Sequence, residues 1–540
     1  MQKQIIYIFI IFTLVIPISC EDHFDIDPKT EILEEDLFSE ESGYYNVLYG
    51  VYLKLNQQNL YGKTLTYDIL EDLAQSYSGT RYRIRGYDYF EPLLGQSGMT
   101  AHDRFTSIWE TMYNAIAECN NLLENLEASP IEFPDGNREM VKAEAMAIRA
   151  FLHFDLLRMF APSVISDPES PAIPYVDNFS LQDFPRLTVN QVLDKIIADL
   201  KSAESLLQVH DPIFIDDPDA KPTLLDLHNS SLIRFNREAR MNYYSVLGIL
   251  SRVQLYAGNK NEAFTYAKKV IEADRFRLPT NAIDYRDPIL TGVFAISISY
   301  NGLNGVYAKD FITETRRDIT YYQLESVYEA DLIRSKDILP WNYRNYGLSE
   351  EEYQLYASFF SENGTNDARI SRKTGKMLIW EDLLEINDTL DFVSDNPGDR
   401  DYRLFENFYK STENSGVRFL KFPDLLHENV PSYLPLLKLS ELYLIAAEAA
   451  PDLNEGLNYL NMQRASANVM PSLSADDITS AELLQDEIEK EYKKELLAEG
   501  QLFYYFKRLN LDTFKGTNGV TIREVDDEIY VIPIPTDQGF

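Results

Sequence analysis

Two short segments of the chain combine aromatic rings with side chains that form hydrogen bonds. Residues 77–90 lie between two stretches with helical spacing, and residues 340–346 lie in a proline-interrupted region. The candidate contacts are Tyr77, Arg81, Tyr82, Tyr87 and Tyr89 in the first segment, and Trp341, Asn342, Tyr343 and Tyr346 in the second. Flat rings stack on the C–H faces of a pyranose, while amides and guanidinium groups bind its hydroxyls. The pattern predicts sugar binding, although a loop aromatic is about as often a packing anchor.

The sequence patterns of known catalytic and metal sites are missing. The histidines are scattered without H-E-x-x-H spacing, and serine-hydrolase elbows and phosphate loops are absent. With 86 acidic residues, a carboxylate pair for glycoside cleavage can be chosen almost anywhere and carries little information. The acidic run Asp216-Asp217-Pro218-Asp219 lacks EF-hand spacing and is more simply a turn than a calcium site. We therefore expect a binding protein without cofactor or metal, not an enzyme.

The acidic charge of the chain argues against negatively charged partners. The chain of 540 residues is 45% hydrophobic, enough for an extensive core, and carries a formal net charge of -36. Such a charge repels nucleic acids and anionic lipid surfaces, which are bound through Lys and Arg.

The N-terminus resembles a bacterial lipoprotein signal. Lys3 precedes an apolar run from Ile5 to Ile18 that is too short to cross a bilayer comfortably and ends at Ser19-Cys20. We expect residues 1–19 to be a signal peptide, Cys20 to be acylated and residues 20–44 to form an acidic tether. The alternative is a plain secretory signal, and Pro17 departs from the usual aliphatic residue. Cys119, the other cysteine of the chain, is expected to be a buried side chain rather than a nucleophile.

Helical spacing dominates both ends of the remaining chain. Apolar residues recur every three or four positions from about residue 45 to 274, with Thr188 as an expected N-cap and Gly258 as a left-handed stop between two helices. Residues 275–430 are expected to be loop-rich, with a strand-like run at Val293–Ser299. Helical spacing returns at Leu436–Ala450, Leu453–Ala467 and Ala481–Gly500. The pattern predicts a mainly α fold with tetratricopeptide-like helical hairpins and a loop-rich irregular region.

A series of segments matches one family in residue identity and in order. The run from Leu437 to Ala449 is similar to L-R-L-S-E-x-Y-L-x-x-A-E-A. Further matches are Trp109, Tyr113, Ile116 and Asn120-Asn121; Glu144-Ala145, Arg149-Ala150 and His153–Leu156; Pro185–Thr188 with Asp199-Leu200; Arg252 to Tyr256 with Gly258; Asp331 with Arg334; Arg418-Phe419 with Lys421-Phe422; Glu495-Leu496, Glu499-Gly500 and Phe506 with Arg508; and Pro533–Pro535. In these segments the chain resembles the SusD/RagB family of nutrient-uptake outer-membrane lipoproteins. Tyr492 and Gln501 depart from it, at positions where Arg, and Arg, His or Asn, are usual.

The resemblance implies a SusD-like α-α superhelix divided into an N-terminal helical region, 45–274, and a C-terminal region, 275–540. It also implies a SusC-like TonB-dependent transporter as partner, an oligosaccharide as ligand, a surface-exposed lipid-anchored position at the outer membrane, and ligand contacts in the two aromatic segments. A peptide-binding uptake subunit and a glycoside hydrolase are the alternatives.

Charged residues inside the matching helices are expected to be structural, because charges are seldom buried unpaired. We expect Arg149, Glu441, Glu448, Glu499 and Arg508 to form buried ion pairs or ties between helices rather than ligand contacts. Trp109 is expected to belong to the core rather than to a ligand surface.

Overall fold

The computed structural model describes residues 34–66, 69–74, 100–215, 232–234, 237, 240–279, 292–297, 408–410, 417–419, 433–467, 469, 472–497, 499–515, 521–523, 525 and 527–535. Within these ranges, no helix has both the length and the apolar character of a membrane span.

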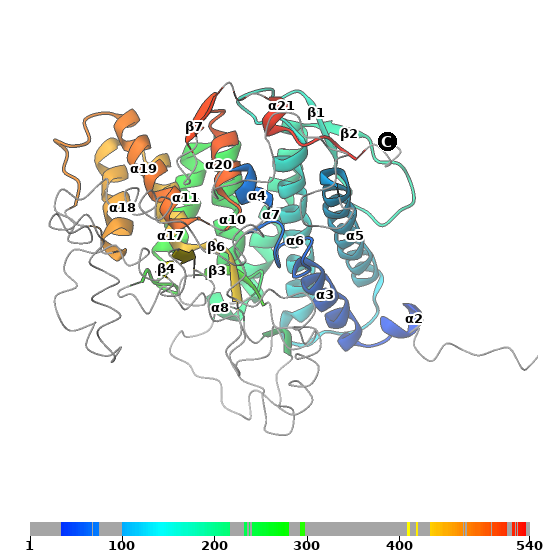
Figure 1. Cartoon of the computed structure of the whole chain (residues 1–540). Coiled ribbons are helices and arrows are strands. Elements are labelled where there is room, and N and C mark those ends of the chain that lie inside the picture. Colours follow the sequence, from blue (N-terminus) through cyan, green and yellow to red (C-terminus); the bar gives the residue numbers. More distant parts are fainter. Residues whose placement is uncertain are drawn as a thin grey trace, which may run out of the picture.

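The N-terminal half is built from long helices that pack side by side (Figure 1). The elements are α2 (Glu34–Leu37), α3 (Glu41–Leu55), α4 (Ile69–Leu73), α5 (Ala101–Ala128), the 3-10 turn η2 (Pro134–Gly136), α6 (Asn137–Phe160), α7 (Val189–His210), α8 (Pro212–Ile215) and η3 (Leu232–Arg234). Capping boxes start α5 at Thr100 and Asp103 and α7 at Thr188 and Gln191. The Thr188 cap is thereby confirmed.

The first helices begin inside the stretch for which a tether was predicted. Helices α2 and α3 start at Glu34 and Glu41, before residue 45. Tyr44 is 2% exposed, and its ring packs edge-on against Phe133 at 5.2 Å between centroids. Burial of that ring joins α3 to the helical body.

Two helical hairpins confirm the tetratricopeptide-like architecture. Helices α10 (Tyr243–Tyr256) and α11 (Lys260–Ile271) are joined at Gly258, whose φ of 81° is left-handed. Helices α17 (Leu439–Ala449) and α18 (Leu453–Ser466) form the second hairpin. The two hairpins pack through α11 and α17.

The strands in the described residues form antiparallel pairs. They are β1 (Pro171–Pro174) with β2 (Arg186–Thr188), β3 (Gly292–Ser297) with β6 (Tyr433–Lys438), β4 (Phe408–Lys410) with β5 (Val417–Phe419), and β7 (Thr513–Lys515) with β8 (Thr521–Arg523). The prediction of a helix from Leu436 was wrong for its first three residues. They continue strand β6, because their backbone pairs with β3, in the register Leu437 opposite Phe294.

The C-terminal helices return to the N-terminal ones. Helix α19 (Ala481–Glu495) ends before Gly500, which corrects the predicted helix end, and α20 (Leu502–Arg508) packs against α4 near the middle of the molecule (Figure 1). Gly500 has φ 70°, and a Cβ there would collide with the carbonyl of Leu65. After α21 (Asp527–Tyr530), the amide of Ile532 donates to the carbonyl of Met159 at 3.0 Å. The first and last parts of the described chain therefore share one hydrophobic core.

Candidate functional site

The residues predicted to contact a ligand lie outside the described residues. This applies to Tyr77, Arg81, Tyr82, Tyr87 and Tyr89 in the first segment, to Trp341, Asn342, Tyr343 and Tyr346 in the second, to Cys20, and to the acidic run at 216–219. In the chain, the first segment lies between α4 and α5. These assignments therefore stay predictions. Trp109 of α5 does lie in the described residues, and at 2% exposed it is confirmed as a core residue.

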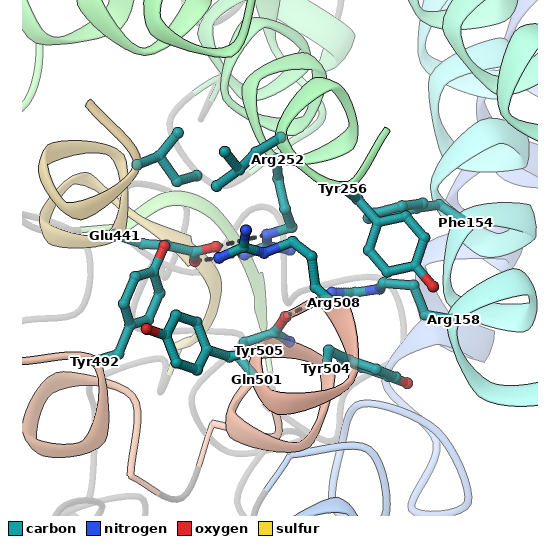
Figure 2. Close-up of a pocket in the computed structure, with 12 residues that line it drawn as sticks. Phe154, Arg158, Arg252, Tyr256, Glu441, Tyr492, Gln501, Tyr504, Tyr505 and Arg508 are labelled. Carbon is teal, nitrogen blue, oxygen red and sulfur yellow. Dashed lines mark hydrogen bonds and ion pairs between the residues drawn. The ribbon is translucent and has the colours of Figure 1, made fainter. Parts of the chain in front are cut away.

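A small pocket lined by charged and aromatic side chains lies where five helices meet, α6, α10, α17, α19 and α20 (Figure 2). Its volume is about 40 Å³. Pockets for drug-sized ligands measure about 300–1,000 Å³, so this space is too small for an oligosaccharide. The residues that line it are Phe154, Arg158, Arg252, Leu255, Tyr256, Glu441, Ile445, Tyr492, Gln501, Tyr504, Tyr505 and Arg508.

Ion pairs between different helices surround the cavity. Arg252 of α10 donates from Nε and Nη2 to the two carboxylate oxygens of Glu441 in α17, at 2.7 and 2.6 Å. Arg508 of α20 donates to both oxygens of Glu448, each at 2.7 Å. Bidentate Arg–carboxylate pairs of this kind fix the relative orientation of the two side chains as well as stabilising their charges. They tie the second hairpin to α10 and α20.

Arg158 is the third guanidinium at the cavity, and its role was missed by the sequence analysis. It pairs with Asp155 one turn earlier on α6 and donates from Nη1 to Gln501 Oε1 at 3.0 Å. Its guanidinium carbon lies 3.8 Å from the ring centroid of Tyr504. The two departures from the family pattern, Tyr492 and Gln501, both line this cavity.

The remaining predicted ion pairs are also present. Arg149 contacts Asp199 at 2.7 Å, and Glu499 contacts Lys438 at 2.8 Å. Lys438 ends strand β6 and also donates to Glu495 at 2.5 Å. Burial alone would lower the pKa of Lys438, but the two carboxylates raise it, so this lysine stays charged.

Burial holds several titratable groups of the frame in their neutral form. Burial raises the pKa of the Cys119 thiol to about 12 and lowers the pKa of His153 to about 3. His153 Nδ1 lies 2.9 Å from the carbonyl of Arg149, and its Nε2 accepts from the amide of Val176 at 3.0 Å. Burial also raises the pKa of Tyr492, Tyr504 and Tyr505, so these phenols are neutral. No cluster of metal-ligating side chains occurs within the described ranges.

Lys507 gives the frame a pH-dependent stability. Its buried amine donates to the carbonyls of Arg158 and Tyr530 at 2.6 and 2.7 Å, and burial lowers its pKa to about 7. The unfolded chain, with a lysine pKa near 10.4, then binds more protons between pH 7 and 10, so stability rises with pH there. We expect the free energy of unfolding of the wild type, relative to Lys507→Met, to increase by about 1 kcal/mol per pH unit above pH 7.5. Denaturant unfolding from pH 7 to 9 measures this, and a constant difference would contradict the buried, neutral amine.

Two family models match the chain. Residues 25–211 match a SusD-like model described as starch-binding associating with outer membrane, and residues 407–528 match the SusD family model. The chain belongs to the SusD/RagB family.

Individual relatives agree with this assignment over most of their length. SusD-like protein P38 of Formosa agariphila is 22% identical over 542 residues, covering 95% of this chain and 93% of the relative. A SusD superfamily protein of Bacteroides thetaiotaomicron has a TM-score of 0.56 at 20% identity, with 92% of this SusD/RagB chain and 96% of that chain covered. A SusD-like carbohydrate binding protein of Bacteroides vulgatus has a TM-score of 0.56 at 20% identity, and the match covers 88% of this chain and 84% of that chain. The predicted mainly α fold with tetratricopeptide-like hairpins is confirmed, while most of the predicted loop-rich stretch, 275–430, lies outside the described residues.

Proposed function

We propose that this SusD/RagB protein is a surface-exposed lipoprotein that captures oligosaccharides and delivers them to a SusC-like TonB-dependent transporter. Membership of the SusD/RagB family supports the proposal that the ligand is a glycan. The single observation that carries the site is the pairing of aromatic rings with hydrogen-bonding side chains in residues 77–90 and 340–346. The described helices supply a frame whose junction is held by ion pairs between helices.

Binding, rather than cleavage, is the proposed activity. A glycan array and a peptide panel, probed with the purified mature chain, test the ligand class. We expect glycans to bind and peptides not to, and incubation with the bound glycans to release no new reducing ends. Binding of peptides alone would replace the proposal with a peptide-uptake role, and steady turnover would make the protein a glycoside hydrolase.

The proposed lipid anchor makes Cys20 necessary for membrane attachment. In cells fed an alkyne-labelled fatty acid, we expect the wild type to be labelled and to sediment with the outer membrane, and Cys20→Ser to lose both properties. Cys119→Ala is the matched control, because Cys119 is 0% exposed and its pKa is raised, so it is protected from acylation. Labelling of Cys20→Ser would contradict the anchor. Co-purification of the wild type with a transporter barrel tests the proposed partner.

A further inference from the structure

The loop between β1 and β2, residues 175–185, presents two large apolar side chains to solvent. Leu181 is fully exposed, and Phe179 is 49% exposed. Among the described residues, Leu181 is the most exposed large apolar side chain. Apolar side chains scattered singly over a surface are common, whereas those grouped at one place are typical of a surface that a partner covers.

The backbone that leads to these side chains is fixed by buried groups of the helical body. Asn120 of α5 donates from Nδ2 to the carbonyls of Val176 and Asn178, at 3.0 and 3.2 Å. Arg149 of α6 donates from Nη1 to the carbonyl of Asp177 at 3.0 Å. Both donors are buried in the helical body. A contact presented on a backbone held in this way loses little conformational entropy when a partner binds.

The same loop lies on the side of the molecule where the described chain begins. The amide of Phe179 donates to Glu124 Oε1 of α5 at 2.7 Å. The hydroxyl of Tyr44 in α3 donates to the carbonyl of Asn125, the next residue of α5, at 3.4 Å. Figure 1 shows the loop, in cyan beside β2, and α2 on the same side of α5.

That side is the one from which the proposed lipid tether leaves the body. A segment that starts at Cys20 and ends at Glu34, where α2 begins, spans at most about 50 Å when fully extended. The tether therefore keeps the side of the body with the loop near the membrane, in which a transporter barrel is embedded. The net charge of -36 opposes close approach to anionic lipid, so a protein suits the apolar pair better than the bilayer does.

We propose that residues 179–181 are a docking point for the SusC-like transporter, with Phe179 and Leu181 seated in an apolar recess of its outer face. This inference rests on the proposed function, which supplies the partner. The docking point holds none of the residues proposed to contact the ligand, so docking and glycan binding are separable.

Co-purification of the transporter barrel from detergent-extracted outer membranes tests the docking point. The double variant Phe179→Ser, Leu181→Ser should recover at least about tenfold less barrel than the wild type, because both apolar anchors are lost. Its glycan affinity and its unfolding midpoint should equal those of the wild type, since both side chains are exposed in the folded chain.

Val209→Ser, Ile215→Ser is the matched control, because these apolar side chains of α7 and α8 are 62% and 49% exposed and lie outside the loop. It should recover as much barrel as the wild type. Undiminished recovery with the loop variant would overturn the docking point and leave the proposed function in place. A wild type that recovers no barrel would contradict the proposed partner itself, and the docking point with it.

A photo-crosslinking side chain identifies what covers the loop. With Leu181 replaced by benzoylphenylalanine, irradiation of intact cells should join the chain to the barrel. No crosslink, or a crosslink confined to lipid, would overturn the proposal. Should the double variant fail to fold, this crosslink decides alone.

Discussion

Replacing Glu144 by Gln is expected to lower the free energy of unfolding by about 3–5 kcal/mol. Glu144 is 0% exposed in α6 and pairs with Arg237 and, at 2.9 Å, with Arg240. Tyr52 of α3 donates to the same carboxylate at 2.6 Å. Burial alone would raise the pKa of Glu144, but the two arginines lower it below its usual range, so the side chain is ionised. The amide removes that charge and keeps the volume, which leaves two buried guanidinium groups with less compensation.

Equilibrium denaturation in urea measures this change. Glu127→Gln is the matched control, because Glu127 pairs with Lys142 at 2.9 Å while its side chain is 76% exposed. Exposed ion pairs contribute little to stability, so this variant should resemble the wild type. Equal destabilisation by the two variants would contradict the importance of the buried network.

Trp341→Ala is expected to weaken glycan binding about 30-fold, which corresponds to about 2 kcal/mol. The proposed role of Trp341 is to stack its ring on a sugar face, and truncation to Ala removes that contact. Calorimetric titration of the folded variant with the glycans identified on the array measures the change.

Trp109→Phe is the matched control for Trp341→Ala, because it alters a tryptophan of the folded core and not a proposed ligand contact. Trp109 packs edge-on against Phe160 in the core, with 4.9 Å between ring centroids. Its replacement should lower stability by about 1–2 kcal/mol and leave the affinity unchanged. A Trp341→Ala variant with wild-type affinity would remove Trp341 from the site.

Local signals in the sequence predicted the helical frame well. Thr188 begins a helix through a hydrogen bond of its own side chain, and Gly258 ends one through its own left-handed backbone. Both signals are local, so one sequence is enough to predict them. The ion pairs of Arg149 and Glu441 were predicted because a charge in an apolar helix pattern needs a partner.

Other features depend on distant parts of the chain. Residues 436–438 have the apolar character of the helix that follows, and only pairing with β3 makes them a strand. Arg237 and Arg240 stand outside every family motif, so nothing local indicated that they bind Glu144. Lys507 is similar, because a lysine near the end of a helix suggests a solvated amine. The ligand-contact residues remain predictions from residue type and family.

Titration of the mature chain with purified oligosaccharides, followed by chromatography of the recovered ligand, tests the central claim most directly. We predict saturable binding of a glycan that is recovered at its original length. A chain that binds none of the glycans offered, or returns them shortened, would contradict a frame built to hold a sugar without cutting it.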